Sequence, residues 1–202
     1  MQAAEMRRQS VVPIECPMIL ISQVQRSGGT LLSQLFDGHP ECFAHPKELT
    51  WGRPTKADWP RIENLDACAQ SLFSELDESW IHHECQRGRY VKSESTNATP
   101  ESYPFVFDRE LQSAIFRDVL NASASQTRRG ILNAYLTSFF NAWLDYQSLY
   151  ETPKKYTVAF CPRVLMATGS YKRFRQDYPN GYVVSSVRRP ESWFASAEKH
   201  GY

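Results

Sequence analysis

The stretch MILISQVQRSGGTLLSQLF, residues 18–36, decides the fold class. Its first seven residues form a short apolar run ahead of a glycine pair, which is typical of a buried β-strand. Leucine and phenylalanine then recur at helical spacing over residues 30–36, and Gly38 followed by His39-Pro40 indicates the end of that helix. This order of strand, glycine-containing turn and helix predicts the first strand–helix unit of an α/β fold.

The rest of the chain continues this alternation. Further strands are expected at residues 41–44, 89–93, 155–160 and 182–187, and helices at residues 65–76, 107–120, 131–150, 164–176 and from about 191. The helix at residues 131–150 has the clearest pattern, because its large apolar side chains recur every three or four positions. Strands alternating with helices predict an α/β fold with a mostly parallel sheet.

The length and charge of the chain limit what it can be. Its 202 residues suffice for one compact domain, which we expect over residues 1–202 with residues 1–12 as a flexible leader. The formal net charge is +1, from 23 basic and 22 acidic residues, so no nucleic-acid or membrane partner is expected. Any anion site must therefore be local.

Cysteine usage and hydropathy bear on location. The five cysteines include no CxxC pair, and a disulfide scaffold is not expected in a chain of this length. No early apolar run is long enough to span a membrane, and the first ten residues lack a signal-peptide pattern, so a cytoplasmic location is expected. The adjacent His82, His83, Glu84 and Cys85 have no second cluster of ligands, so we expect no metal site.

Residues 25–30, Gln-Arg-Ser-Gly-Gly-Thr, have the composition of an anion-binding loop. Gly28 and Gly29 allow backbone N–H groups to approach an oxyanion, and the following helix adds positive potential at its N-terminus. Arg26 adds a planar, bidentate donor, while Ser27 and Thr30 add hydroxyls. No lysine precedes the threonine, so this is not the Walker pattern. Alone, the loop is equally well explained as an ordinary turn.

A second candidate segment follows the strand expected at residues 182–187. Arg188 stands at the carboxyl end of that strand, where parallel sheets place their ligands. Ser196 lies eight residues later, on a helix face that can turn towards the same anion. Taken alone, this segment is better explained as a solvated basic strand end. Arg163, just after the strand at residues 155–160, is a further candidate anion contact, although a surface arginine is the favoured interpretation.

Together the two segments resemble the nucleotide-binding motifs of sulfotransferases. QRSGGTLL, residues 25–32, is similar to the 5′-phosphosulfate loop, usually written PKSGTTWL, or PRSGTTL in the tyrosylprotein branch. SSVRRPESWFASA, residues 185–197, resembles the 3′-phosphate motif, an apolar strand followed by R-D-P and by a serine eight residues after the arginine. FDGHPE, residues 36–41, is similar to an LDAHPE-like segment of the tyrosylprotein and bacterial branches. The clear resemblance covers residues 18–41 and 182–197.

The resemblance implies a P-loop-NTPase-like three-layer α/β/α fold and a sulfotransferase activity. The sulfuryl group would pass from 3′-phosphoadenosine 5′-phosphosulfate (PAPS) to a hydroxyl or amine of a small-molecule or peptide acceptor. The implied contacts are Arg26 at the leaving bridging oxygen, Ser27, Gly28, Gly29 and Thr30 at the 5′-phosphosulfate, and Arg188 and Ser196 at the 3′-phosphate. No metal is implied, because arginines and backbone donors replace the cation. The sequence departs from the motifs at Gln25, Gly29 and Arg189, which stand for Pro, Thr and Asp.

A catalytic base is expected near the loop, at the carboxyl end of a neighbouring strand. Ala44-His45-Pro46-Lys47-Glu48 occupies that position. The tyrosylprotein branch has a glutamate about twenty residues after the loop arginine, and this count reaches Pro46 or Lys47, so the register does not match. We favour Glu48 as the base. His45 is the other candidate, because histidine accepts protons near neutral pH. A solvated loop is the alternative.

Two other functions stay open at this point. One is an incomplete or non-catalytic nucleotide-binding domain, because the chain stops six residues after Ser196, whereas sulfotransferases usually continue for several more elements. We therefore expect a protein that lacks its C-terminal part. The other is a P-loop-like kinase, which the absence of the Walker lysine and of a metal-holding acid disfavours. No motif identifies the acceptor.

Overall fold

The computed structural model describes residues 2–49, 51, 58–77, 89–90, 102–103, 105–123 and 126–199. The chain divides into two compact units, which are considered separately. Unit 1 contains Met1–Ile14 and Asp66–Glu151, and unit 2 contains Glu15–Leu65 and Thr152–Tyr202. The single domain expected over the whole chain stays a prediction. The histidine-rich segment at residues 82–85 and the end of the strand expected at 89–93 lie outside the described residues.

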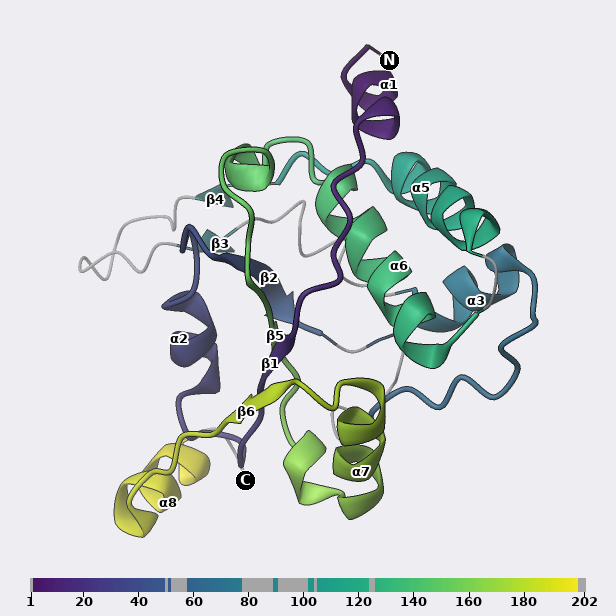
Figure 1. The fold of residues 1–202 in the computed structure, drawn as a ribbon. Helices are drawn as coiled ribbons and strands as arrows, with labels where there is room; N and C mark the ends of the chain where they lie inside the picture. The colour runs from purple at the N-terminus through teal and green to yellow at the C-terminus, as the bar shows by residue number, and fades with distance from the viewer. Residues whose placement is uncertain are drawn as a thin grey trace. The chain divides into compact units, whose positions relative to one another are not determined.

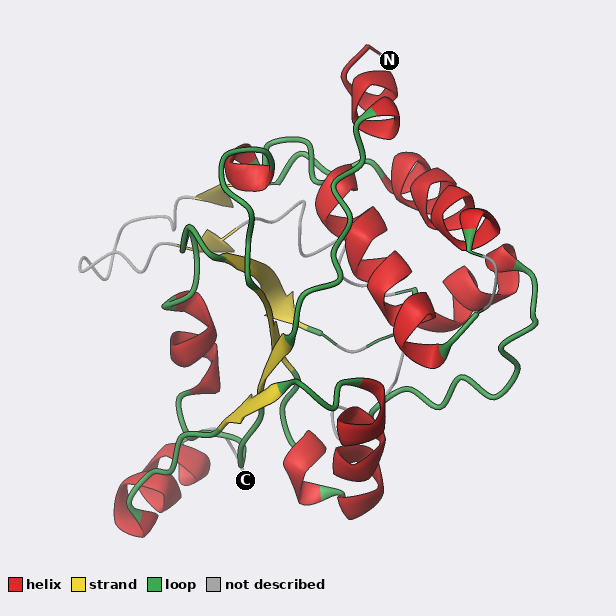
Figure 2. Ribbon diagram, viewed as in Figure 1, coloured by secondary structure: helices red, strands yellow, loops and turns green. Residues whose placement is uncertain are grey.

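Unit 2 is built on a four-stranded parallel sheet, drawn as arrows in Figures 1 and 2. Its strands are β1 (Met18–Ile21), β2 (Cys42–Glu48), β5 (Tyr156–Phe160) and β6 (Tyr182–Val184), and their spatial order is β2-β5-β1-β6. All three strand pairs are parallel. The α/β class and the parallel sheet predicted from the sequence are therefore confirmed.

Helices cover the sheet of unit 2 on its two sides. Figure 1 shows α2 (Gly29–Gln34) on one side and α7 (Thr168–Asp177) on the other. Leu32 and Phe36 pack against Ile21, Val158 and Phe160, which form the core beneath α2. Since side chains alternate along a strand, Met18 and Leu20 point to the opposite face, and both are fully buried. The apolar side chains of β1 are therefore buried on both faces of the sheet.

A tryptophan fixes the loop after β2 to helix α7. The ring of Trp59 packs edge-on against Phe174 at a centroid distance of 5.1 Å, and its indole Nε1 donates to Asp177 Oδ2 over 2.8 Å. Trp59 is fully buried, and an indole N–H at such a depth needs an acceptor. The expected helix at residues 164–176 becomes a short 3₁₀ turn (Val164–Met166) followed by α7, because Ala167 between them is extended.

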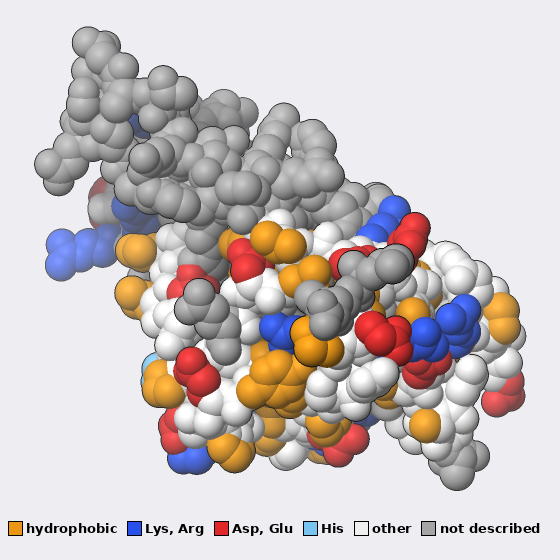
Figure 3. Space-filling model, turned by 90° about the horizontal axis from the view of Figure 1, so that it is seen from above, with side chains coloured by type: hydrophobic (Ala, Val, Ile, Leu, Met, Phe, Trp, Pro, Cys, Tyr) orange, Lys and Arg blue, Asp and Glu red, His pale blue; other side chains and the backbone are white. Residues whose placement is uncertain are grey.

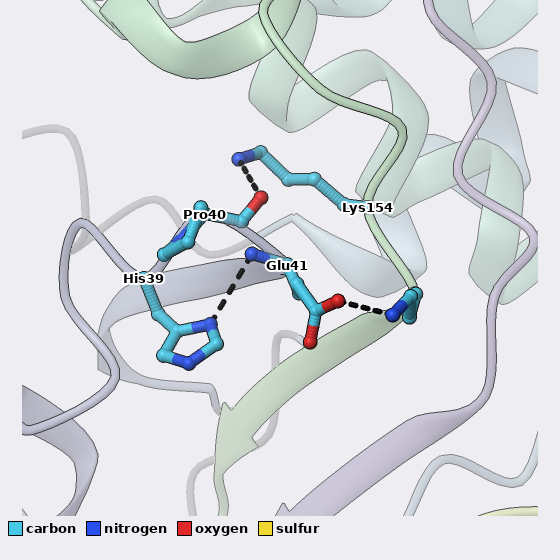
Figure 4. Close-up of polar contacts among 5 residues, drawn as sticks. His39, Pro40, Glu41 and Lys154 are labelled. Atoms are coloured by element: carbon cyan, nitrogen blue, oxygen red, sulfur yellow. Dashed lines mark hydrogen bonds and ion pairs between the residues drawn. The ribbon is translucent and has the colours of Figure 1, made fainter.

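Polar contacts join the start of β2 to the start of β5 (Figure 4). Lys154 Nζ donates to the Pro40 carbonyl over 3.2 Å, and the Lys155 ammonium is paired with the Glu41 carboxylate. The backbone N–H of Lys155 also donates to the Glu41 carbonyl. These contacts fix the register at the amino end of both strands.

Unit 1 is helical in its described part. It contains α1 (Gln2–Gln9), α3 (Ala69–Leu76), α5 (Arg109–Ala122), α6 (Arg128–Ala142), a 3₁₀ turn (Gln147–Leu149) and the two-residue strands β3 (Arg89–Tyr90) and β4 (Ser102–Tyr103). Side chains cap the two long helices: Asp108 accepts from the N–H of Leu111, and Thr127 accepts from the N–H of Gly130. These caps satisfy orphan donors at the first turns of α5 and α6.

Residues 1–12 were expected to be a flexible leader, but the structure has helix α1 there. Arg8 donates to Asp118 of α5 over 2.8 Å, and the N–H of Val12 donates to Asn141 Oδ1 of α6 over 2.9 Å. The N–H of Ile14 also donates to the hydroxyl of Thr137. Polar partners on two helices thus hold this segment, which its own composition could not show.

Helix α6 ends well before the predicted boundary at residue 150. Trp143 leaves the helix in an extended conformation and forms a β-bridge with Phe107. The N–H of Leu144 then donates to the Val106 carbonyl over 2.7 Å. A competing backbone pairing therefore stops a helix whose apolar periodicity continues.

Figure 3 shows hydrophobic side chains gathered among charged ones on the face seen from above. In unit 1, Met6, Val106 and Tyr150 are each more than half exposed, and the Arg7 guanidinium lies 4.9 Å from the centroid of the Tyr150 ring.

Among the described residues, no helix is both long and apolar enough to cross a membrane.

Candidate functional site

The carboxyl ends of the strands of unit 2 lie level with one another. Ile21 at the end of β1 pairs with Phe160 of β5 and with Val184 of β6, and Phe160 pairs in turn with Glu48 of β2. The segments that leave these four strands therefore start from one edge of the sheet. This is the edge at which open parallel sheets bind ligands.

The loop after β1 contains two kinds of backbone constraint. Arg26 and Gly28 have φ values of 64° and 91°, in the left-handed region. A Cβ on Gly28 would meet nothing within 4 Å, so this glycine serves the conformation. Gly29 serves close packing, because its Cβ would lie 1.5 Å from Gln23 Nε2 and 2.6 Å from Phe160 Cε2. Gly28 is thus needed for the backbone conformation of the loop, and Gly29 for the close packing around it.

Three long-range hydrogen bonds join the loop to the second candidate segment. Ser186 Oγ donates to the Ser27 carbonyl over 2.7 Å, and Trp193 Nε1 donates to the Gln25 carbonyl over 2.7 Å. Arg188 Nη1 donates to the Arg26 carbonyl over 3.2 Å. Three consecutive loop carbonyls are thereby occupied as acceptors, which reduces the negative potential that an approaching anion meets. The structure brings together the two segments that the sequence analysis paired.

A pocket of about 230 Å³ opens beside the loop. It is lined by Val24, Gln25, Arg26, Arg163, Met166, Trp193 and Ala197. Its exposed walls are almost entirely apolar, although two arginines are among the lining residues. The pocket is too small for a whole nucleotide, because ligand pockets typically measure about 300–1,000 Å³, but it suits a single group at the loop.

The other predicted loop residues differ in exposure. Ser27 is half-buried and Thr30 is exposed, at the first turn of α2. Arg188 is exposed, and Ser196 is half-buried in α8 (Pro190–Glu198). In the part of the chain that the structure describes, Ser196 makes no hydrogen bond to the loop. The structure thus brings Arg26, Ser27 and Arg188 together at the loop. Ser196 is connected to the loop only through helix α8, whose Trp193 donates to the Gln25 carbonyl.

The two candidate bases lie in the second half of β2. His45 is 3% exposed, and its Nδ1 lies 2.9 Å from the Lys47 carbonyl, which can only accept. The ring therefore donates through Nδ1. Glu48 is half-buried and lies two strands from Ile21, which corresponds to about 10 Å between backbones. The structure thus brings Glu48 to the loop edge, whereas His45 lies within the strand.

A bulge positions Glu48. β2 pairs with β5 at Ala44–Val158 and again at Glu48–Phe160, so three residues of β2 stand opposite one residue of β5. Pro46 lies inside this irregularity, where its missing N–H costs no ladder hydrogen bond. At the other end of the strand, burial raises the pKa of the Cys42 thiol and keeps it protonated.

Sequence reasoning missed Gln23, Ser186 and Trp193. Gln23 is 3% exposed, its Nε2 lies next to the position of the missing Gly29 Cβ, and its Oε1 makes no hydrogen bond to the described residues. The sequence signal that could have identified Gln23 is its position, as a polar residue, directly after a buried strand. Ser186 and Trp193 lie within the second motif, but no distinctive sequence pattern marks them as contacts to the loop.

The fold and the site define an α/β protein with a candidate anion-binding edge. No protein-family model, curated protein or solved structure gives a significant match to this chain. Among the described residues, no group of three or more His, Cys, Asp or Glu side chains is arranged to hold a metal ion.

Proposed function

We propose that unit 2 binds PAPS in a P-loop-like α/β/α fold and that the chain transfers the sulfuryl group to a hydroxyl or amine acceptor. The observation that carries this proposal is the set of hydrogen bonds from Ser186, Arg188 and Trp193 to the carbonyls of residues 25–27. Two segments with sulfotransferase-like sequences, about 160 residues apart, meet at the ligand-binding edge of a parallel sheet.

The residues at this edge fit a nucleotide with oxyanions at both ends. The guanidinium groups of Arg26 and Arg188 can each form bidentate hydrogen bonds with such a group. The space beside Gly28 is open, so the backbone can approach a ligand closely there. Ser27 and Thr30 add hydroxyl donors. This donor set matches the charge of a phosphosulfate and needs no metal ligand.

In the proposed reaction, bound PAPS supplies an activated sulfuryl group on its 5′-phosphate. Arg26 balances the negative charge that develops on the leaving phosphate oxygen. Glu48 accepts the proton of the acceptor hydroxyl as the new sulfur–oxygen bond forms and the bond to the phosphate breaks. Arg188 and Ser196 hold the 3′-phosphate. Positioning and electrostatics supply most of the effect, as in phosphoryl transfer.

Thermal unfolding tests this proposal. Saturating adenosine 3′,5′-bisphosphate, the product nucleotide, raises the Tm by roughly 5–10 °C at a hundredfold excess over its Kd. ATP with Mg²⁺ does not, because no Walker lysine precedes Thr30. Arg188→Ala is expected to weaken the shift. The reverse ranking of the two nucleotides favours a kinase, and a shift without measurable transfer to any acceptor favours a non-catalytic binding domain.

A further inference from the structure

Apolar side chains from three segments of unit 2 meet at the pocket beside the loop. Val24 comes from the loop after β1, Met166 from the 3₁₀ turn after β5, and Trp193 from α8. Val24 and Met166 are both exposed. Contact with water is unfavourable for such side chains, and their convergence on one concave site is typical of a ligand pocket. The pocket therefore has the lining of a binding site for an apolar group.

The pocket offers few polar atoms to a ligand, because its exposed lining is almost entirely apolar. The indole N–H of Trp193 is bonded to the Gln25 carbonyl over 2.7 Å, so the ring presents carbon atoms. The Nε atoms of Arg26 and Arg163 are buried, which leaves the aliphatic stems of these arginines as the apolar surface that they can offer. A ligand rich in hydroxyl groups would leave them without partners here, and its binding would be weak.

The volume of the pocket, about 230 Å³, limits the size of the group that it can hold. An apolar cavity of about 150 Å³ is sufficient for benzene. The pocket thus accommodates a single six-membered ring with a short substituent. Adenine fits poorly, because its ring nitrogens and amino group need hydrogen-bonding partners that the exposed lining does not supply.

The pocket also adjoins the strand end beside which the proposed base lies. Glu48 pairs with Phe160, the last residue of β5, and Arg163, which follows soon after β5, lines the pocket. Arg26 belongs both to this lining and to the loop proposed to bind the phosphosulfate. A reactive group on a ring in the pocket would therefore lie at the same edge of the sheet as the sulfuryl donor and the base.

We infer that this pocket binds the apolar part of the acceptor, which carries its hydroxyl or amine on a compact apolar ring and not on a sugar. This inference rests on the proposed function, which assigns the phosphosulfate to the loop and the acceptor's proton to Glu48. Val24, Met166 and Trp193 then select the acceptor by its apolar surface, while Glu48 acts on its hydroxyl or amine.

Two ring alcohols with the same carbon skeleton test the assignment. Cyclohexanol has far fewer hydroxyl groups than myo-inositol, and an NMR titration follows the indole N–H resonance of Trp193, which Trp193→Phe identifies. Cyclohexanol is expected to bind with a Kd at least about tenfold lower than that of myo-inositol, and Met166→Ser should weaken cyclohexanol by at least about tenfold. Leu35→Ser, at an exposed leucine of unit 2 outside the pocket lining, is the matched control.

Adding adenosine 3′,5′-bisphosphate distinguishes the acceptor from the nucleotide as the occupant. The bisphosphate and cyclohexanol should bind at the same time, and competition between them would overturn the inference. Cyclohexanol binding that is no tighter than that of myo-inositol, or that neither Met166→Ser nor the similarly shaped Val24→Thr weakens, would also overturn it. If the wild type binds cyclohexanol but not the bisphosphate, the proposed function fails, while the preference of the pocket for an apolar ring stands.

Discussion

The ends of β1 and β2 lie on the same edge of one sheet but are organised differently. The loop after β1 is held by hydrogen bonds to residues 186–193, far away in the sequence. The second half of β2 is shaped locally, by a bulge around Pro46 and by the contact from His45 to the Lys47 carbonyl. The binding half of the proposed site is thus fixed by tertiary structure, while the position of the base depends on the bulge.

Replacing the candidate bases should have the largest effect. Glu48→Gln removes the proton acceptor at the loop edge and is expected to lower the rate of sulfuryl transfer by at least about a hundredfold. His45→Gln should change that rate much less and mainly lower the stability, because His45 is buried within the strand. Turnover with a saturating acceptor, and Tm for both variants, measure this difference. A rate loss that is larger for His45→Gln would assign the base to His45.

The glycine pair tests the β1 end through stability. Gly29→Ala places a methyl group against Gln23 and Phe160 and should cost about 1–3 kcal/mol of unfolding free energy, as overpacking does. Gly28→Ala meets no neighbour and should cost about 1–2 kcal/mol through its left-handed φ alone. Urea unfolding measures both variants. A larger loss in Gly28→Ala would show that conformation, and not space, limits the loop.

The smallest effect is expected where β2 begins. The ammonium of Lys155 lowers the pKa of the Glu41 carboxyl below its ordinary value of 4.5, and the pair is exposed to solvent. A lowered pKa means that the pair stabilises the fold above the ordinary value, and that this contribution is lost as the pH falls through the lower, folded value. Glu41→Gln should therefore lower the Tm slightly at pH 7, and this difference should shrink as the pH is lowered below 4.5.

Glu63, an exposed acid of the same unit, provides the control for that measurement. Glu63→Gln should show the same Tm difference from the wild type at pH 7 and at lower pH. A Glu41→Gln difference that does not shrink as the pH falls, or that does not shrink in high salt, would contradict the ion-pair explanation.

Local patterns predicted the sheet of unit 2 well. The strands at residues 18–21, 156–160 and 182–184 were expected within a few residues, because buried parallel strands read as short apolar runs. The Gly28-Gly29 turn and Arg188 were also visible, since glycine and arginine carry local meaning. What the sequence could not show was which strand lies beside β1. The order β2-β5-β1-β6 places Arg163 next to the loop, and no spacing rule gives that neighbour.

The misses share a physical cause. Helix α1 and the early end of α6 depend on partners far away in the chain, such as Asn141 for Val12 and Phe107 for Trp143. Gln23 was missed for the same reason, because the tight space that it occupies beside Gly29 is also bordered by Phe160, which is far away in the chain. Periodicity reports the burial of a face, but it does not report which backbone or side chain will compete for it.

The hydrogen bonds that hold the loop also have a consequence for biosynthesis. Ser27 is made early, whereas its partner Ser186 follows 159 residues later. At about 5–20 residues per second, a ribosome needs roughly 8–30 s to reach that partner. During this interval the nascent loop lacks all three of its tertiary bonds, and β1 lacks its neighbour β5 until residues 156–160 have been made. The anion-binding edge therefore cannot be completed during translation until residues 186–193 have been made.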